Sequence, residues 1–70
     1  MILLRDLFEN SIIHEDDYFI VVKDGVLISD NRYGINEDYK QYFNHPVTRM
    51  YSKSNTKTDF IKIKIGNKED

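Results

Sequence analysis

The chain has 70 residues and a formal net charge of −2 at pH 7, which allows one domain built around one small core. It contains no cysteine, so a disulfide framework and a thiolate metal site are both excluded. With 40% hydrophobic and 31% charged residues, the composition is that of a globular protein and not of a disordered chain.

The N-terminal stretch from Ile2 to Glu9 predicts a two-turn amphipathic helix. Its apolar side chains recur at a spacing that places them on one helix face: Leu3, Leu4, Leu7 and Phe8. A helix this short is not stable alone, so this face must pack on another apolar surface. Arg5 and Asp6 interrupt the apolar run too early for a signal peptide or a membrane span, which predicts a cytoplasmic protein.

The run YFIVVKDGVLIS predicts a β-hairpin. Two stretches rich in β-branched and aromatic residues, Tyr18–Lys23 and Val26–Ser29, flank the pair Asp24-Gly25. This pair tolerates positive φ at both central positions of a type I′ turn. Because the first stretch is apolar on both of its faces, we expect it to be a central strand that is covered on both sides.

Two more strands are predicted after Pro46. The first is Val47–Lys53, with Pro46 at its start, where the missing N–H group of a proline is tolerated, and the polar residues 54–58 form the loop that follows it. The second is the run DFIKIKI, in which alternation turns the isoleucines toward the core. The same alternation turns the other side chains of this run outward: Phe60, Lys62 and Lys64. The tail over residues 66–70 is expected to fray.

A short helix is predicted over residues 37–43, between the hairpins. Asn36 suits its N-cap, and Glu37 and Asp38 suit the positive end of the helix dipole. We expect the aromatic residues of this region to divide between core and surface: Tyr39 and Phe43 inward, Tyr33 and Tyr42 at least partly outward. The order of elements predicts a single α+β domain with a small four-stranded, mostly antiparallel sheet, a short N-terminal helix and a short helix between two hairpins.

No stretch of the chain carries a recognisable catalytic or metal-binding motif. The residues of His14–Asp17 point in different directions, so they would offer one metal ion at most two ligands. The stretch that begins at Asp30 fails the calcium-loop pattern because its glycine is fifth and not sixth. The serines and histidines lack the strained or glycine-rich context of an activated nucleophile. We therefore expect a protein that is not an enzyme and holds no cofactor.

Two surfaces are candidates for binding a partner. Charge is unevenly distributed, since residues 1–45 carry nine acidic and four basic side chains and residues 46–70 carry three and six. The first candidate surface combines acids with tyrosines, which suits a basic protein partner: Asp30, Tyr33, Glu37, Asp38 and Tyr42. The second is a basic cluster that would bind nucleic acid, with Tyr51 and Phe60 available for stacking: Arg49, Lys53, Lys57, Lys62 and Lys64.

Each candidate surface has a simpler explanation. The aromatic residues of the short helix would merely close the core. The alternating lysines would merely protect the edge of the sheet from pairing with other chains. A third hypothesis is a homodimer in which two sheets pair through Phe60 and Tyr51.

The pattern of apolar positions along most of the chain resembles the small accessory proteins of phages and mobile elements of low-GC bacteria. It includes LLRDLFEN, DDYFIVVKDGVLI, a V-x-x-h-Y strand at Val47–Tyr51 and an I-x-I-x-I strand at Ile61–Ile65. Several such proteins, anti-CRISPR proteins among them, inhibit a host defence complex by binding to it stoichiometrically. The resemblance implies this role and transfers no functional residue.

The first hypothesis is therefore a non-catalytic, phage-type inhibitor that acts in the host cytoplasm. It would bind a host defence or nucleic-acid-handling protein through the acidic and tyrosine surface. The alternative is a small nucleic-acid-binding module that uses the basic face of the C-terminal hairpin. Binding that weakens steeply with salt distinguishes this alternative, because phosphate contacts release counterions.

Overall fold

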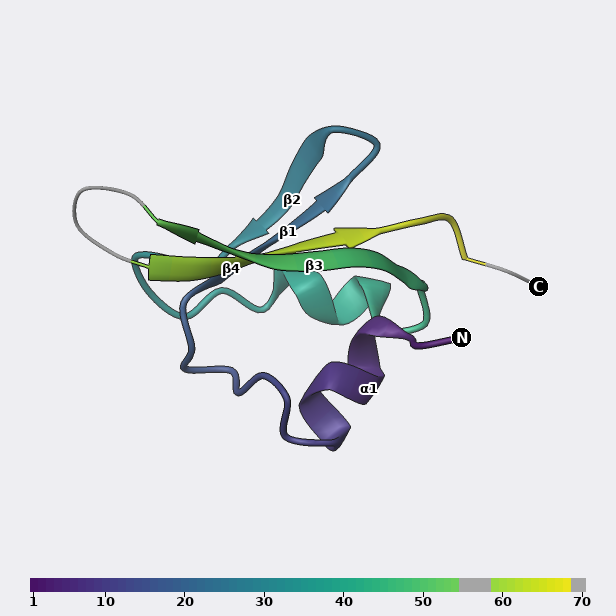
Figure 1. Cartoon of the computed structure of the whole chain (residues 1–70), viewed down its shortest axis with the longest axis horizontal. Coiled ribbons are helices and arrows are strands. Elements are labelled where there is room, and N and C mark those ends of the chain that lie inside the picture. Colours follow the sequence, from purple (N-terminus) through teal and green to yellow (C-terminus); the bar gives the residue numbers. More distant parts are fainter. Residues whose placement is uncertain (55–58, 69–70) are drawn as a thin grey trace.

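The helices and strands form two layers, one of strands and one of helices (Figure 1). The computed structural model describes residues 1–54 and 59–68. Its elements are, in chain order, α1 (Leu4–Glu9), β1 (Phe19–Lys23), β2 (Val26–Asp30), the 3₁₀ helix η1 (Asp38–Tyr42), β3 (Val47–Ser54) and β4 (Asp59–Ile65). The four strands make one sheet, and both helices lie against the same face of it (Figure 1). The predicted α+β architecture is confirmed.

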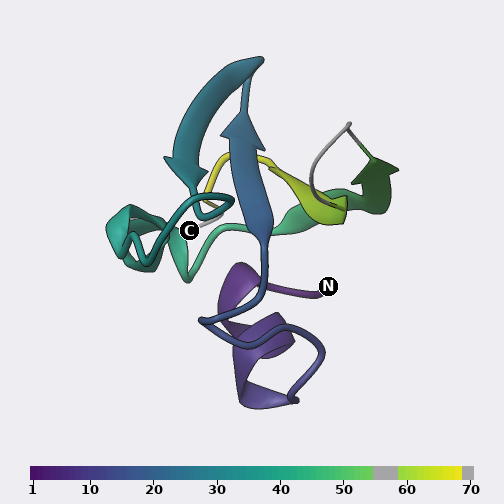
Figure 2. The same ribbon diagram turned by 90° about the vertical axis from the view of Figure 1, so that its left-hand side faces the viewer.

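The strand order β2-β1-β4-β3 places β1 and β4 in the middle of the sheet. The two hairpins are antiparallel, as predicted, whereas β1 and β4 run parallel with Phe19 opposite Ile61. Asp30 lies beside the start of β1, and Val47 lies beside the end of β4. The connection between them must therefore run the length of the sheet, and it carries η1 beneath the strands (Figures 1 and 2).

The core lies between the lower face of the sheet and the two helices. Its buried apolar side chains are Leu4, Leu7, Ile13, Phe19, Val21, Tyr39, Ile63 and Ile65. Phe8 stacks on Tyr39 with ring centroids 4.9 Å apart, and Phe19 meets the same ring edge-on at 5.2 Å. Phe43 packs against this core, whereas Tyr33 is 77% exposed, so the predicted division of the aromatic residues is confirmed.

Backbone hydrogen bonds attach α1 to the turn that follows η1. The Leu4 N–H donates to the His45 carbonyl at 2.9 Å, and the Arg5 N–H donates to the Phe43 carbonyl at 3.0 Å. These bonds satisfy two of the N–H groups that the first turn of a helix leaves without an intrahelical partner. Tertiary contacts thus hold a helix that is too short to persist alone.

The helix begins two residues later than predicted because Ile2 and Leu3 are extended. The Val47 N–H donates to the Ile2 carbonyl at 2.8 Å, and Leu3 bridges to Pro46. The Leu3 N–H donates to the Asp6 carboxylate at 2.8 Å. The first residues therefore lie along the beginning of β3 before the chain turns into α1.

The predicted helix over residues 37–43 is the 3₁₀ helix η1, over Asp38–Tyr42. The Lys40 N–H bonds to the carbonyl of Glu37, three residues earlier, at 3.0 Å. Asn36 contributes to its start, since Asn36 Oδ1 accepts the Asp38 N–H at 2.8 Å. The helix ends at Tyr42, and the Phe43 N–H closes it by donating to the Lys40 carbonyl at 3.4 Å.

The prediction of a frayed tail is wrong at its first residue. The Gly66 N–H donates to the Pro46 carbonyl at 2.9 Å, and the His45 Nδ1–H donates to the Gly66 carbonyl at 2.9 Å. Asn67 and Lys68 are exposed, and residues 69–70 lie outside the described residues. Of the predicted loop 54–58, Ser54 belongs to β3 and the other residues also lie outside the described ranges.

The turn between β1 and β2 has the predicted type I′ conformation, with φ of +52° at Asp24 and +76° at Gly25. A Cβ atom added at Gly25 would meet no atom within 4 Å, so a substitution there has only a conformational cost. Gly34 is equally open and has no positive φ. The two glycines therefore differ in backbone conformation and not in available space, so Gly34 can serve as the control for a substitution at Gly25.

We expect Gly25→Ala to lower the free energy of unfolding by about 1–2 kcal/mol, because L-residues are strained at positive φ. Gly34→Ala should leave it unchanged or raise it by roughly 0.4–1 kcal/mol, since it restricts only the unfolded chain. Urea denaturation followed by circular dichroism measures both values. Equal effects of the two substitutions would contradict the assigned turn.

Candidate functional site

The sheet face that points away from α1 and η1, here named the outer face, carries aromatic and basic side chains. Strand alternation brings Phe60, Lys62 and Lys64 of β4 to this face, as predicted. Cross-strand pairs join them to β3: Phe60 with Lys53, Lys62 with Tyr51, and Lys64 with Arg49. No helix among the described residues covers this face (Figure 1).

Two apolar residues of β1 form the floor of the outer face. Ile20 and Val22 are each only 9% exposed although they lie on the uncovered side of the sheet. Their neighbours on the parallel strand are Lys62 and Lys64. The aliphatic stems of long basic side chains can shield apolar surface while the charged ends stay in water, which explains the low exposure of this floor.

Tyr51 is the centre of the basic cluster. Arg49 Cζ lies 5.1 Å from the centroid of its ring, Lys53 Nζ lies at 5.2 Å and Lys62 Nζ at 5.9 Å. Cations at these distances are attracted to the π-face of an aromatic ring. Desolvation would raise the pKa of Tyr51, but the hydrogen bond with Lys62 and the neighbouring lysine charges outweigh it and lower the pKa.

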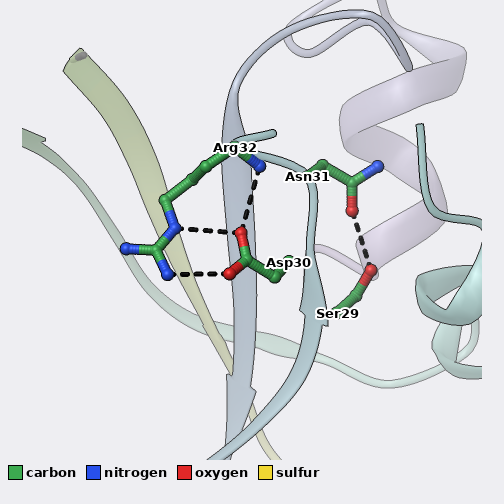
Figure 3. Close-up of polar contacts among 4 residues, drawn as sticks. All are labelled: Ser29, Asp30, Asn31 and Arg32. Atoms are coloured by element: carbon green, nitrogen blue, oxygen red, sulfur yellow. Dashed lines mark hydrogen bonds and ion pairs between the residues drawn. The ribbon is translucent and has the colours of Figure 1, made fainter. Parts of the chain in front are cut away.

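Arg32 extends this chemistry toward β2. Its Nε and Nη2 donate to the two carboxylate oxygens of Asp30 at 2.9 and 2.7 Å, in a bidentate pair that Figure 3 shows. The guanidinium lies 5.1 Å from the centroid of the Phe60 ring and 5.2 Å from that of Tyr33. Arg32 therefore connects the end of β2 with β4, on the far side of β1.

A buried polar pair holds the chain on either side of Arg32 in place. Ser29 Oγ donates to Asn31 Oδ1 at 2.8 Å (Figure 3), and Asn31 Nδ2 donates to the Asn36 carbonyl at 2.8 Å. Ser29 and Asn31 are 1% and 2% exposed, so leaving either without its partner would carry a desolvation cost. These bonds fix the backbone from which Arg32 projects onto the outer face.

Together these residues form a continuous stripe of alternating aromatic rings and cations across the outer face. We name it the aromatic–cation stripe: Tyr33, Arg32, Phe60, Lys53, Tyr51, Arg49 and Lys62. Within the described part of the chain this face carries five basic side chains and one acidic one: Arg32, Arg49, Lys53, Lys62, Lys64 and Asp30. The acidic one is already paired with Arg32, so the face is strongly positive on a chain of net negative charge.

The structure divides the acidic and tyrosine surface that the sequence suggested. Asp30 and Tyr33 lie at the stripe through their contacts with Arg32. Glu37, Asp38 and Tyr42 belong to the helical layer on the other side of the sheet (Figures 1 and 2). The five residues are therefore divided between the stripe and the helical layer.

Within the helical layer, Glu37 and Asp38 are exposed and Tyr42 is half-buried. Glu37 pairs with Lys40 at 2.9 Å, and Tyr42 packs against the core and the His45 ring.

The described residues of the predicted basic cluster, by contrast, lie together on the outer face. Arg49, Lys53 and Lys62 converge on Tyr51, and Lys64 lies opposite Arg49. Lys57 lies outside the described residues. The simpler explanation, in which the lysines of the last strand protect a sheet edge, is wrong because β4 is an inner strand.

Sequence reasoning missed Arg32 as a member of this site. The local signal was an aspartate two residues before an arginine, which is a spacing that allows a bidentate pair. The contact with Phe60 joins residues far apart in the chain and left no local signal.

The remaining observations on the described residues concern metal ligands and membrane spans. In residues 1–54 and 59–68, no group of three or more His, Cys, Asp or Glu side chains is placed to hold a metal ion. Across the same residues, no helix is long and apolar enough to cross a membrane.

Comparisons with protein-family models, curated proteins and solved structures found no match to the chain.

The Asp30–Arg32 pair should make stability depend on pH. The hydrogen bonds from Arg32 lower the pKa of Asp30 from its ordinary value of 3.8. Because the pKa is lower in the folded state, the pair stabilises the fold above the unfolded-state pKa, and this contribution is lost as the pH falls through the folded-state value.

We expect Arg32→Gln to make the unfolding free energy fall less steeply than in the wild type as the pH is lowered below about 5. Urea denaturation at a series of pH values measures the slope. The backbone N–H of residue 32 still donates to Asp30 Oδ1 in this variant, so adding Asp30→Asn should change the slope by much less than Arg32→Gln does. A wild-type slope in Arg32→Gln would show that the pair is not formed in solution.

Proposed function

We propose that this protein is a non-catalytic binding module whose outer face binds single-stranded nucleic acid. The observation that carries the proposal is Tyr51 on an uncovered sheet face, with three cations between 5.1 and 5.9 Å from its ring centroid. Single-strand binding combines aromatic rings on which bases stack with a positive surface that follows the phosphates. The aromatic–cation stripe supplies both.

The position of the lysines supports this proposal. Lys62 and Lys64 lie on an inner strand, which has no free edge. Protection of a sheet edge against pairing with other chains therefore does not explain these two lysines. A sheet face that needed only solubility would be served by mixed charges, whereas this face is almost uniformly basic. The acidic remainder of the chain would repel phosphates and so direct a nucleic acid to the outer face.

A single strand fits this face better than a duplex. The cross-strand pairs place Tyr51 and Phe60 diagonally across β3 and β4, at a spacing of about 7–8 Å for such positions. Both rings can meet a base only if the bases are unpaired and splayed from the backbone. A duplex would offer only its phosphates to this flat surface.

Fluorescence anisotropy with a labelled oligouridylate tests the proposal. We expect binding at low salt that weakens steeply as salt is added, and Lys62→Gln should reduce the slope of log K against log salt by about 0.7. Tyr51→Ala should weaken binding by about 1–3 kcal/mol, the contribution of one stacked base.

Lys40→Gln is the matched control for the lysine variant. It removes one positive charge from η1, on the other side of the sheet, so it should leave the affinity nearly unchanged. An absence of binding at low salt, or equal effects of Lys40→Gln and Lys62→Gln, would contradict the proposal.

A phage-type, anti-CRISPR-like inhibitor of a host defence protein is the second candidate function. Two large side chains of one loop favour it, since Tyr33 is 77% exposed and Ile35 is 74% exposed. Exposed aromatic and aliphatic side chains near acidic residues suit a basic protein partner in the host cytoplasm. The positive outer face gives less support to a homodimer through Phe60 and Tyr51, because two such faces would repel each other.

Charge reversal at Glu37 and Asp38 separates the two functions. If the acidic surface binds a host protein, E37K/D38K should abolish co-purification of that protein from host extract, with the fold intact by circular dichroism. Tyr51→Ala should leave this co-purification unaffected. The opposite pattern, in which only Tyr51→Ala matters, would exclude the acidic surface and direct attention to the outer face.

A further inference from the structure

The edge of the sheet formed by β3 is open along most of its described length. β3 is the longer of the two edge strands, with eight residues against five in β2. All its residues are exposed except Val47 and Tyr51, which are half-buried. Within residues 1–54 and 59–68, the only backbone hydrogen bond that β3 makes on the side away from β4 joins the Val47 N–H to the Ile2 carbonyl. The remainder of this edge is therefore accessible to a partner.

The pairing of β4 shows which backbone groups of β3 point away from the sheet. The Ile61 N–H donates to the Tyr18 carbonyl, so Ile61 and the residues that alternate with it direct their backbone groups toward β1. The other residues of β4 direct theirs toward β3, where they meet Arg49, Tyr51 and Lys53. The backbone N–H and carbonyl groups that point to the free edge are therefore those of Met50, Ser52 and Ser54.

The first residues of the chain already pair with the beginning of this edge. The Val47 N–H donates to the Ile2 carbonyl at 2.8 Å, and Leu3 bridges to Pro46 in the antiparallel sense. The edge thus accepts an extended antiparallel segment where the chain itself supplies one. Beyond Val47, a segment from another molecule can pair in the same way.

The side chains along the open part of the edge indicate which segment fits. Arg49 and Lys53 lie on the outer face, on either side of Tyr51, and neither forms an ion pair among the described residues. An added strand would meet them at non-hydrogen-bonded positions, where side chains of neighbouring strands lie closest. Opposite charges that face each other across strands are stabilising and like charges are destabilising. An acidic strand therefore fits this edge, whereas a second copy of β3 would bring two basic edges together.

We propose that the free edge of β3 binds an extended acidic segment of a partner protein, which adds to the sheet as an antiparallel strand. The segment carries a carboxylate opposite Lys53 and another opposite Arg49, with an apolar side chain between them opposite Tyr51. Main-chain hydrogen bonds with the outward groups of β3 provide affinity, and the charge pairs provide specificity. This site goes beyond the proposed function, because it uses the edge of the sheet whereas a nucleic acid would lie on its outer face.

Fluorescence anisotropy with labelled synthetic peptides tests the charge preference. The peptide TETVTET places two glutamates and a valine at the required alternate positions, and TKTVTKT is its charge-reversed control. At low salt, we expect the wild-type protein to bind the glutamate peptide about tenfold more tightly than the lysine peptide. The double variant R49E/K53E should reverse this preference. Equal binding of the two peptides by the wild type would overturn the charge assignment.

Two N-methylated forms of TETVTET test the strand addition itself at constant charge. In the proposed register, the third and fifth residues direct their N–H groups toward β3, and the second and sixth direct theirs to water. Methylation of the third and fifth nitrogens should weaken binding by about tenfold or more, whereas methylation of the second and sixth should leave it nearly unchanged. Equal affinities of the two forms would show that charge alone holds the peptide and would exclude strand addition.

A substitution in the protein provides the reciprocal test. Ser52→Pro removes an N–H group that points to the free edge, a position where a sheet tolerates proline, and Ser52→Ala retains this group. Only Ser52→Pro should abolish binding of TETVTET, with the fold intact by circular dichroism. If the peptide binds neither the wild type nor Ser52→Ala at low salt, the proposal fails. Dimerisation of the wild type that Ser52→Pro prevents would assign the edge to a second copy of the chain and overturn the proposal.

Discussion

The parallel pairing of β1 with β4 is the constraint on which the rest of this structure depends. It joins two hairpins into one sheet and moves β4 from an edge to the interior. Because β2 ends and β3 begins at opposite ends of the central pair, the connection between them has to pass beneath the strands. That passage carries Tyr39 into the middle of the aromatic core. The sheet, the helical layer and the core thus follow from one long-range pairing.

Successive side chains of β4 lie on opposite faces of the sheet, so this strand contributes to both the core and the outer face. Ile63 and Ile65 are buried in the core, while Lys62 and Lys64 stand on the outer face. The described residues form two short helices, and both cover the same side of the sheet. On the outer face, the aliphatic stems of basic side chains lie over the apolar residues of β1 and shield them from water. This arrangement leaves the charged ends together at the surface.

The parts of this fold that depend on neighbouring residues could be predicted from sequence. The turn at Asp24-Gly25 and the alternation of the isoleucines are set locally, and both were correct. The strand order is set by contacts between distant residues, so neither the inner position of β4 nor the approach of Arg32 to Phe60 could be foreseen.

The residues of the acidic and tyrosine surface are divided between two elements for the same reason. Its residues are close in sequence, but the chain passes from the end of β2 into the helical layer between them. Residues close in sequence were thereby placed on opposite sides of the sheet. Of the basic set, by contrast, the described members lie on paired strands and stay together.

The central pairing also determines how the chain must fold. Phe19 and Ile61 are separated by 42 residues in a chain of 70, so closing this contact carries a large loop-entropy cost before any core is gained. The pairing of β1 with β2 is local, so this hairpin can form early. We therefore expect docking of β4 to be the slow step, and the outer face is assembled only when that step is complete.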